Sequence, residues 1–292
     1  MSVQSKLEYL TQKSEKPIYH ASISGRNARH SLDQPTQAVA VEVHDARDRN
    51  PSDNKTEFGM HESGFDLFNH ESAVQDFLDQ VQIKDGYETE IEGLLKSVTG
   101  CYRVHIFDHT VRASDPEVRE LKQIRESVFL VHGDYTSGSG FVCLRENIGD
   151  EAAELSKGRF QIINVWRPLV DPVEDFPLAL CDLRSVSEQD LVDTERRAPN
   201  HTGELQLAVH SPAHRWFYYP GMRPDEVLLF KTFDSINGGH SPCSIHSAIK
   251  LPDAATDARP RESIETRAFV FYLNCEAGPI FDANPGSVLN AN

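Results

Sequence analysis

The residues best able to do chemistry form one short motif, His132-Gly133-Asp134, at the end of an apolar run. In a strand, residues two apart point to the same face, so His132 and Asp134 can both face one interior point. Gly133 between them lets another group approach the backbone. An imidazole and a carboxylate on one face are two of the three ligands of a 2-His-1-carboxylate triad, which holds Fe(II) and leaves coordination positions open. The alternative is a strand-end histidine in a turn, followed by a capping aspartate.

The third ligand of such a triad must come from a distant strand. His246 is the best candidate, because it lies in the short apolar segment 245–249. Three other histidines compete with it: His240 lies in a Gly-rich stretch typical of a loop, and His210 and His214 flank a proline in a turn. A surface position is the more common one for histidines in such segments, which favours His246.

An Arg-x-Ser sequence opens the last long apolar run of the chain. A guanidinium can bind a carboxylate with two parallel hydrogen bonds, and a hydroxyl two residues later faces the same side. Arg261 and Ser263 therefore suit the distal carboxylate of 2-oxoglutarate, whose other end would chelate the iron. Arg267 lies on the same strand face and is the alternative for this carboxylate or for a substrate acid. Asn164 could bind the cosubstrate inside a barrel, or be a buried polar group with its own protein partner.

Arginines near this site would suit an acidic substrate, such as an amino or carboxylic acid. Arg125, Arg167 and Arg267 are the arginine candidates, and Tyr135, directly after the motif, is a further one. The alternative is that these arginines lie on the surface, which is their most common location. The Gly-rich nucleotide-binding motifs and the GxSxG nucleophile motif do not occur in the sequence, which argues against a nucleotide fold and an α/β-hydrolase.

Short strands must position these residues. After Gly100, runs rich in Val, Ile and Phe alternate with turn residues, which is typical of strands. The predicted strands are 102–107, 127–132, 160–166, 178–181, 203–209, 214–219, 226–233, 244–249 and 263–273. So many short strands with few helices between them indicate a mainly β sandwich or barrel.

Two helices and an arm precede these strands. Apolar residues repeat with helical spacing from Val74 to Val81 and from Ile91 to Val98, which predicts two helices against the outside of a sheet. Residues 1–57 are mostly polar and contain a charged stretch rich in turn formers, which predicts an extended N-terminal arm or surface loops. We expect one domain over residues 58–292.

Composition narrows the setting of the protein. The 292 residues carry a formal net charge of −16, which argues against binding to nucleic acid or to an anionic membrane surface. The five cysteines are odd in number and widely spaced, without a CxxC motif, which favours a reducing compartment. No apolar run reaches the roughly 20 residues of a membrane-spanning helix, and the first residues lack the apolar core of a secretion signal. We therefore expect a cytoplasmic protein.

Eight stretches between about residues 57 and 275 match one known family in the same order, among them Asn-Val-Trp-Arg-Pro at 164–168. The matching stretches are 93–100, 104–112, 131–134, 162–168, 177–182, 214–219, 225–235 and 261–267. On these residues the chain resembles the gibberellin-desaturase-like and cephem-methoxylase-like hydroxylases and desaturases of secondary metabolism.

The resemblance implies a double-stranded β-helix (jelly-roll) and oxidation that depends on Fe(II), 2-oxoglutarate and O₂. It implies that His132, Asp134 and His246 form the triad, because they occupy the HxD and distal histidine positions of the family. Arg261 follows His246 at a longer spacing than is common in related oxygenases, so the choice between Arg261 and Arg267 stays open. The family hydroxylates, desaturates and forms rings, so the substrate is not determined. The alternative function is a non-catalytic, cupin-like binding protein, and an extended arm could wrap a second subunit in a homodimer.

Overall fold

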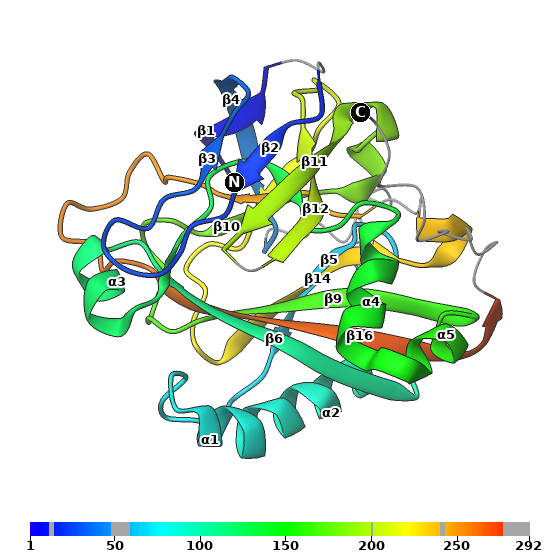
Figure 1. The fold of residues 1–292 in the computed structure, drawn as a ribbon. Helices are drawn as coiled ribbons and strands as arrows, with labels where there is room; N and C mark the ends of the chain where they lie inside the picture. Colours follow the sequence, from blue (N-terminus) through cyan, green and yellow to red (C-terminus); the bar gives the residue numbers. More distant parts are fainter. Residues whose placement is uncertain (12–14, 48–58, 200, 240–242, 277–292) are drawn as a thin grey trace.

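Two β-sheets, one of ten strands and one of six, make up the body of the molecule, with helices on the outside (Figure 1). The structure is a computed structural model and describes residues 1–11, 15–47, 59–199, 201–239 and 243–276. The ten-stranded sheet lies above the six-stranded sheet in Figure 1. The prediction of a mainly β, double-stranded β-helix fold with flanking helices is confirmed. Among the described residues, no helix is long and apolar enough to cross a membrane.

The ten-stranded sheet contains the strand that carries the HxD motif. In spatial order it consists of β1 (Ser2–Leu10), β4 (Thr36–Asp45), β13 (Trp216–Tyr218), β10 (Leu178–Cys181), β15 (His246–Ala248), β8 (His132–Gly133), β12 (His201–Ala208), β11 (Leu191–Ala198), β2 (Ile18–His20) and β3 (Ser31–Leu32). The pairs β4–β13 and β2–β11 are parallel, and the other pairs are antiparallel. The two short strands β8 and β15 lie side by side in the middle of this sheet.

The six-stranded sheet lies beneath the ten-stranded one. Its strands, in spatial order, are β5 (Phe65–Asn69), β14 (Glu226–Asp234), β9 (Gly158–Pro168), β16 (Glu262–Glu276), β6 (Arg103–Ala113) and β7 (Arg125–Glu126). Every residue of β9 from Phe160 to Pro168 is buried, because one face of the strand lines the interior and the other lies under a helix. This explains why the apolar residues of β9, such as Ile162 and Ile163, fall on both faces and do not alternate regularly with polar ones.

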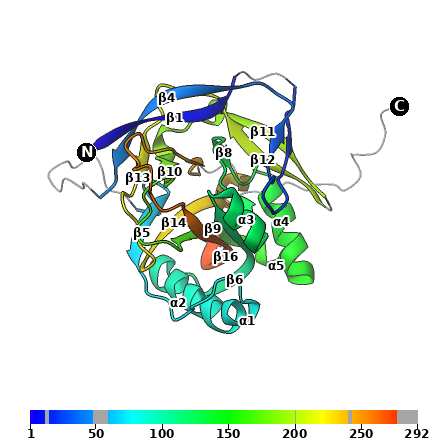
Figure 2. The ribbon, with the colours of Figure 1, turned by 90° about the vertical axis from the view of Figure 1, so that its left-hand side faces the viewer.

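Helices and short helical turns surround the two sheets. One group lies below the outer face of the six-stranded sheet (Figure 2), and another packs against inward-facing residues at one end of that sheet. The helices are α1 (Gln80–Gln82), the π-helical turn η1 (Ile83–Tyr87), α2 (Glu88–Thr99), α3 (Pro116–Lys122), α4 (Ser139–Ile148) and α5 (Ala152–Leu155), with 3₁₀ turns η2 (Gly149–Glu151), η3 (Leu183–Ser185), η4 (Glu188–Asp190) and η5 (Ile236–Gly239). On α2, Ile91 and Leu95 are fully buried against Ile163, Val165 and Ile264 of the sheet. The prediction that these helices pack outside a sheet is confirmed.

The first helix begins later in the sequence than predicted. Val74 packs into the same apolar cluster as α2, but the helical backbone begins only at Gln80, where the Asp79 carboxylate accepts hydrogen bonds from two backbone N–H groups. Helical structure then continues through η1 and α2 to Gly100, whose left-handed conformation (φ 68°) ends it. The apolar spacing therefore marked the burial of Val74 but not of Leu78 and Val81, which are 38% and 66% exposed. The capping aspartate determines where the helix starts.

The N-terminal segment differs from the expected arm or set of surface loops. Residues 2–45 contribute β1, β2, β3 and β4 to the ten-stranded sheet. In β1, Ser5, Leu7 and Tyr9 are buried while the residues between them are not, so an alternating pattern is hidden by the polar residues of the other face. The expected boundary at 57/58 lies outside the described residues, and the division of the chain there stays a prediction.

Other elements also differ from those expected. The predicted strand over 127–132 is reduced to β8, and the strands β5, β7 and β11 and the helices α3, α4 and α5 were not predicted. Of these, α4 matters most for the site, because it packs beside β14 through Gly140, which is buried.

The close approach of α4 to β14 generates a stability prediction. A Cβ atom at Gly140 would overlap the ring of Phe233, so Gly140→Ala should lower the free energy of unfolding by about 2 kcal/mol. Gly93→Ala in α2 is the matched control, because a Cβ there meets no other atom within 4 Å. It should raise stability by about 0.5–1 kcal/mol, since alanine is the better helix former. Urea unfolding followed by circular dichroism checks both, and equal effects would contradict the close packing.

Candidate functional site

Two histidines and an aspartate meet between the sheets. His132 of β8 and His246 of β15 are paired directly across neighbouring antiparallel strands, with ring centroids 4.3 Å apart. Asp134 follows His132 by two residues, and its Oδ1 lies 3.7 Å from Nε2 of each histidine. The three ligand-type atoms lie within 4.8 Å of one another, and no other group of this kind is found in the described part of the chain. A separation of 3.7 Å is too long for a hydrogen bond but suits atoms arranged around a common ion.

The protonation of the two imidazoles fits a cation. Nδ1 of His132 donates a hydrogen bond to the Leu130 carbonyl, 2.7 Å away, so the lone pair is on Nε2, which faces Asp134. Burial lowers the pKa of His132 to about 3, and the neighbouring His246 lowers it further in the same direction. Burial also lowers the pKa of His246. Both rings are therefore neutral at neutral pH, which is the form that binds metals.

The second carboxylate oxygen of Asp134 is held from the opposite sheet. Oδ2 accepts a hydrogen bond from Nδ2 of Asn164, 2.7 Å away, and one from Nε of Arg267, 3.3 Å away. Burial alone would raise the pKa of Asp134, but the charge of Arg267 and the hydrogen bond from Asn164 hold it below its usual range. Asp134 is thus ionised, with Oδ1 turned toward the histidines.

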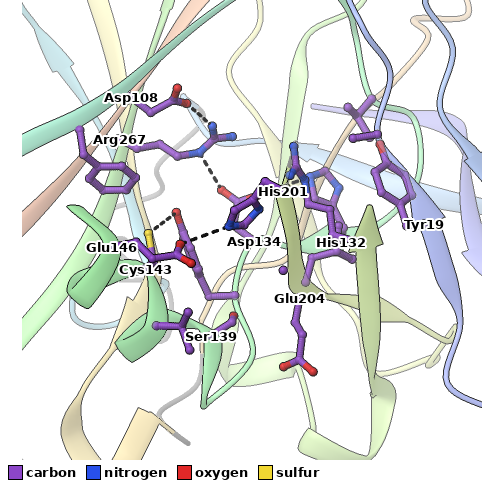
Figure 3. A pocket seen from close by; sticks show the side chains of 18 of the residues that line it. Tyr19, Asp108, His132, Asp134, Ser139, Cys143, Glu146, His201, Glu204 and Arg267 are labelled. Atoms are coloured by element: carbon purple, nitrogen blue, oxygen red, sulfur yellow. Dashed lines mark hydrogen bonds and ion pairs between the residues drawn. The ribbon is translucent and has the colours of Figure 1, made fainter. Parts of the chain in front are cut away.

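Arg267 is the centre of a buried charge network (Figure 3). Besides Asp134, it contacts Asp108, with Nη1 2.5 Å from Oδ2, and Glu265. Asn164, Arg267 and Asp108 lie in one row across β9, β16 and β6. The register between β16 and β6 shifts directly after Arg267, where β6 contains one additional residue, Phe107. Such bulges commonly redirect side chains beside active sites. The three carboxylates outweigh the burial of Arg267 and keep its pKa above the usual range.

Arg261 and Ser263 lie on the other side of the histidines. Arg261 is almost completely buried; its guanidinium donates to the Phe176 carbonyl (2.7 Å) and to the Ser127 hydroxyl (2.6 Å) and lies over the Trp166 ring. Its Nε and the Ser263 hydroxyl are buried without a hydrogen-bond partner. Burial lowers the pKa of Arg261 to about 10, so the group is still charged at neutral pH. Two unsatisfied buried donors of this kind fit a ligand carboxylate.

Two adjoining cavities connect these groups. A small one of about 30 Å³ is lined by His132, His246 and Arg261. A larger one of about 430 Å³ is lined by Asp134, Tyr135 and Arg125, among others, and its size is typical of small-molecule sites. The residues that line both are Arg112, Val128, His132 and Arg267. Two ligands could therefore occupy neighbouring spaces beside one metal ion.

Some predicted site residues lie elsewhere or make other contacts. Arg167 is a correction: it points to the outer face of the sheet, where it donates to the Tyr87 hydroxyl and the His70 carbonyl, because it alternates with the inward-facing Trp166. Asn164 is a second correction, since it lines neither cavity and its amide is bonded to Asp134. For Arg267, the charge is already compensated by protein carboxylates, which argues against the alternative that it grips a ligand acid.

The competing histidines are remote from the triad. His210 and His214 pack against Tyr9, and His214 lies 3.3 Å from Asp190. His240 lies outside the described residues.

Sequence reasoning missed several residues that line or support the site: Tyr19, Asp108, Arg112, Arg196 and Glu265. Arg112 belongs to the part of β6 that continues beyond the predicted strand 102–107. Its alternation with the inward-facing Asp108 and Thr110 offered a signal that was not used. Arg196 lies in a charged stretch of β11 without an apolar alternation, so the sequence contained no comparable signal for it.

Comparisons with known proteins agree with this geometry. A family model described as "Oxidoreductase/YMDC permease-like domain" matches residues 7–271. The alpha-ketoglutarate-dependent dioxygenase phiK of a fungal species is 33% identical over 92% of this chain and 96% of its own length. The hydroxylase/desaturase CTB9 of Cercospora beticola is 34% identical over 90% of each chain. A solved structure of the iron and alpha-ketoglutarate-dependent endoperoxidase NvfI is similar with a TM-score of 0.78 and 28% identity, covering 93% of this chain and 98% of that one.

The charge network around Arg267 generates a second stability prediction. Arg267→Met would leave three neighbouring carboxylates without their cation, and removing one partner of a buried ion pair lowers stability by about 3–5 kcal/mol. Arg197→Met is the matched control, because Arg197 is about half exposed and pairs only with Glu195; it should change stability by less than about 0.5 kcal/mol. Urea unfolding of the metal-free proteins measures both. A small effect of Arg267→Met would show that the network does not stabilise the fold.

Proposed function

Because the chain belongs to this oxidoreductase family, and within it to the fungal Fe(II)/2-oxoglutarate-dependent dioxygenases and hydroxylase/desaturases of secondary metabolism, we propose that His132, Asp134 and His246 hold its iron. The chain is thus an Fe(II)/2-oxoglutarate-dependent dioxygenase, and the prediction of such an enzyme is confirmed over the non-catalytic, cupin-like alternative. The observation that carries the ligand assignment is the convergence of three neutral or anionic ligand atoms within 4.8 Å of one another. Two imidazoles and one carboxylate are the donor set typical of Fe(II) oxygenases.

When bound, iron and 2-oxoglutarate supply the oxidative decarboxylation that consumes O₂, releases succinate and CO₂, and provides the oxidant for an unactivated C–H bond. The protein residues hold and orient these groups. The Leu130 carbonyl fixes the tautomer of His132, and Asn164 and Arg267 fix the rotation of the Asp134 carboxylate. Such outer contacts orient ligands and influence metal affinity. Asn164 is therefore assigned to Asp134, in place of the cosubstrate.

We assign the distal carboxylate of 2-oxoglutarate to Arg261 and Ser263. The support is that both contribute a buried donor without a partner and that Arg261 borders the small cavity next to His132 and His246. The Arg261 charge at neutral pH suits a carboxylate. Val128, Leu178 and Trp166 form an apolar part of the same wall and reduce the access of water to the bound diacid.

The larger cavity is the proposed substrate site. It adjoins the triad and takes a small molecule, with Arg125 and Tyr135 as substrate-contacting residues and an amino or carboxylic acid as the class expected from sequence. Location in the cytoplasm stays a prediction. The homodimer is not part of the proposal, because the strands of the expected arm pair within the sheet of their own chain.

The metal assignment is tested by spectroscopy. Anaerobic addition of Fe(II) and 2-oxoglutarate should produce the weak visible charge-transfer band of the chelate. His132→Ala should abolish the band and succinate formation, because it removes a ligand from a three-ligand site. His210→Ala, on the far side of the sheet, should leave both unchanged. Absence of the band from the folded wild-type protein at saturating ligand, or its survival in His132→Ala, would reject the assignment.

The cosubstrate assignment is tested separately. Arg261→Met should raise the dissociation constant of 2-oxoglutarate at least about tenfold, as expected for loss of charged hydrogen bonds, while Fe(II) affinity stays constant. Ser263→Ala removes only the hydroxyl and should produce a smaller loss in the same direction. Arg259→Met is the matched control, because Arg259 is exposed two residues earlier. Titration of the visible band with 2-oxoglutarate measures the constants, and unchanged affinity in both Arg261→Met and Ser263→Ala would reject the assignment.

A further inference from the structure

Three arginines from three strands line the larger cavity: Arg112 of β6, Arg125 of β7 and Arg196 of β11. We refer to them as the arginine cluster. Arg125 is the direct neighbour of Arg112 in the parallel β6–β7 ladder. Arg196 is paired with Tyr19 in the parallel β11–β2 ladder, and Tyr19 lines the same cavity. The cluster is thus assembled where strands of the two sheets approach each other.

None of the three has an acidic partner among the residues that the structure describes. The one hydrogen bond found for their guanidinium groups runs from Arg112 Nη1 to the Glu126 backbone carbonyl, 2.8 Å away. The carboxylates of the cavity wall have other partners: Asp108 and Asp134 pair with Arg267, Glu146 with His201, and Glu204 with Lys16. Asp108 attracts Arg125 at longer range, but its short ion pair is with Arg267. Although the chain has a net charge of −16, none of the three arginines forms a short ion pair with a carboxylate among the described residues.

The arginines oppose one another electrostatically. Burial lowers the pKa of Arg125, and Arg112 and Arg196 lower it further. Burial raises the pKa of Tyr19 to about 12 in spite of these arginines, so its hydroxyl stays a hydrogen-bond donor. Like charges held together in a partly desolvated wall destabilise the folded state, and a bound anion offsets that cost.

The other residues of the cavity wall indicate the chemistry of the rest of the ligand. Five apolar side chains also line the cavity: Val128, Leu130, Val142, Leu205 and Leu207. In Figure 3, Tyr19 lies on one side of His132, and Arg267 and Asp108 lie on the other. A ligand with an acid at one end and an apolar skeleton would place its acid on the arginines and its carbon atoms next to the metal ligands.

We propose that the arginine cluster binds the carboxylate of the substrate, so that the substrate is a carboxylic acid with an apolar skeleton. This inference rests on the function proposed above, because it takes the triad as the reacting centre. It adds two residues, Arg112 and Arg196, that the sequence did not single out, and gives Arg125 a defined role. Arg112 borders both cavities, whereas Arg125 and Arg196 border only the larger one, so these two report on substrate without touching the cosubstrate space.

The test uses the full chain loaded anaerobically with Fe(II) and saturating 2-oxoglutarate. Calorimetric titration compares cyclohexanecarboxylate, its neutral carboxamide and cyclohexyl phosphate. The carboxylate should bind at least about tenfold more tightly than the amide, since each charged hydrogen bond contributes on the order of 1.5–3 kcal/mol. Arg125→Gln and Arg196→Gln should each weaken carboxylate binding about tenfold and leave amide binding unchanged.

Arg197→Gln is the matched control, because Arg197 is the next residue on β11, faces the other side and pairs with Glu195; it should bind all probes like wild type. Equal binding of acid and amide, no binding of the acid, or unchanged affinity in both cluster variants would overturn the inference. Tighter binding of the phosphate would overturn the assignment to a carboxylate. The visible band of the Fe(II)–2-oxoglutarate chelate distinguishes failure of this inference from failure of the proposed function. If the band is present but the binding results contradict the inference, the proposed function stands and the inference falls. If the band is missing from the wild-type protein, the proposed function falls. Loss of the band only in the cluster variants would assign the arginines to the cosubstrate and overturn the inference.

Discussion

The ion pair between Arg267 and Asp134 joins the two sheets at the point where the chemistry would occur. Arg267 belongs to the six-stranded sheet, and Asp134 follows a two-residue strand of the ten-stranded sheet. The guanidinium also pairs with Asp108 and Glu265, so one cation serves three neighbouring carboxylates. Because the direction of the Asp134 carboxylate depends on this contact, the position of its free oxygen relative to the histidines depends on the separation of the sheets. Packing of the barrel and geometry of the candidate metal centre are therefore coupled.

The rest of the site follows from strand register around that contact. The pairing of β8 with β15 places His132 opposite His246, and the row through β9, β16 and β6 places Asn164 and Asp108 on either side of Arg267. Arg261 lies six residues before Arg267, at the other end of the small cavity. One long strand thus supplies both the cation that orients a metal ligand and the cation proposed for the cosubstrate. The two roles are separated along β16. The charge of Arg267 is compensated by protein carboxylates, whereas the charge of Arg261 is compensated only in part.

Local patterns in the sequence pointed to the candidate triad, because strand alternation puts His132 and Asp134 on one face whatever the rest of the fold is. The choice of His246 required the pairing of strands more than a hundred residues apart, which local spacing does not encode; there the apolar context of the residue was the useful signal. The choice between Arg261 and Arg267 could not be made from sequence at all, because both face the same side of one strand. It depends on which guanidinium meets protein carboxylates, and these come from β6 and from the residues after β8.

The sequence predictions that were wrong or incomplete have equally specific structural causes. Leu7 and Tyr9 belong to a strand whose exposed face is polar, so overall composition concealed a core element. Arg167 was mistaken for a site residue although alternation with Trp166 turns it outward, toward η1. The strand β11 has charged residues on both faces, because it lies near the end of its sheet and covers a polar cavity, so its apolar pattern is weak. Because β11 was not predicted, Arg196 was not recognised as a residue of the site.

The place of the arginine cluster in the architecture affects how such an enzyme can diversify. β7 is the last strand of the six-stranded sheet, and β11 and β2 are close to the end of the ten-stranded sheet. The triad, by contrast, depends on β8 and β15, which have neighbours on both sides. Of the strands that carry the cluster, only β7 has a single neighbour. A substitution at Arg125 therefore disturbs one ladder, so selection can change this proposed substrate contact while the oxidising centre is inherited unchanged. Enzymes with this architecture can acquire new substrates through substitutions in the strands at the ends of their sheets, and an engineer who seeks altered selectivity would begin with these strands.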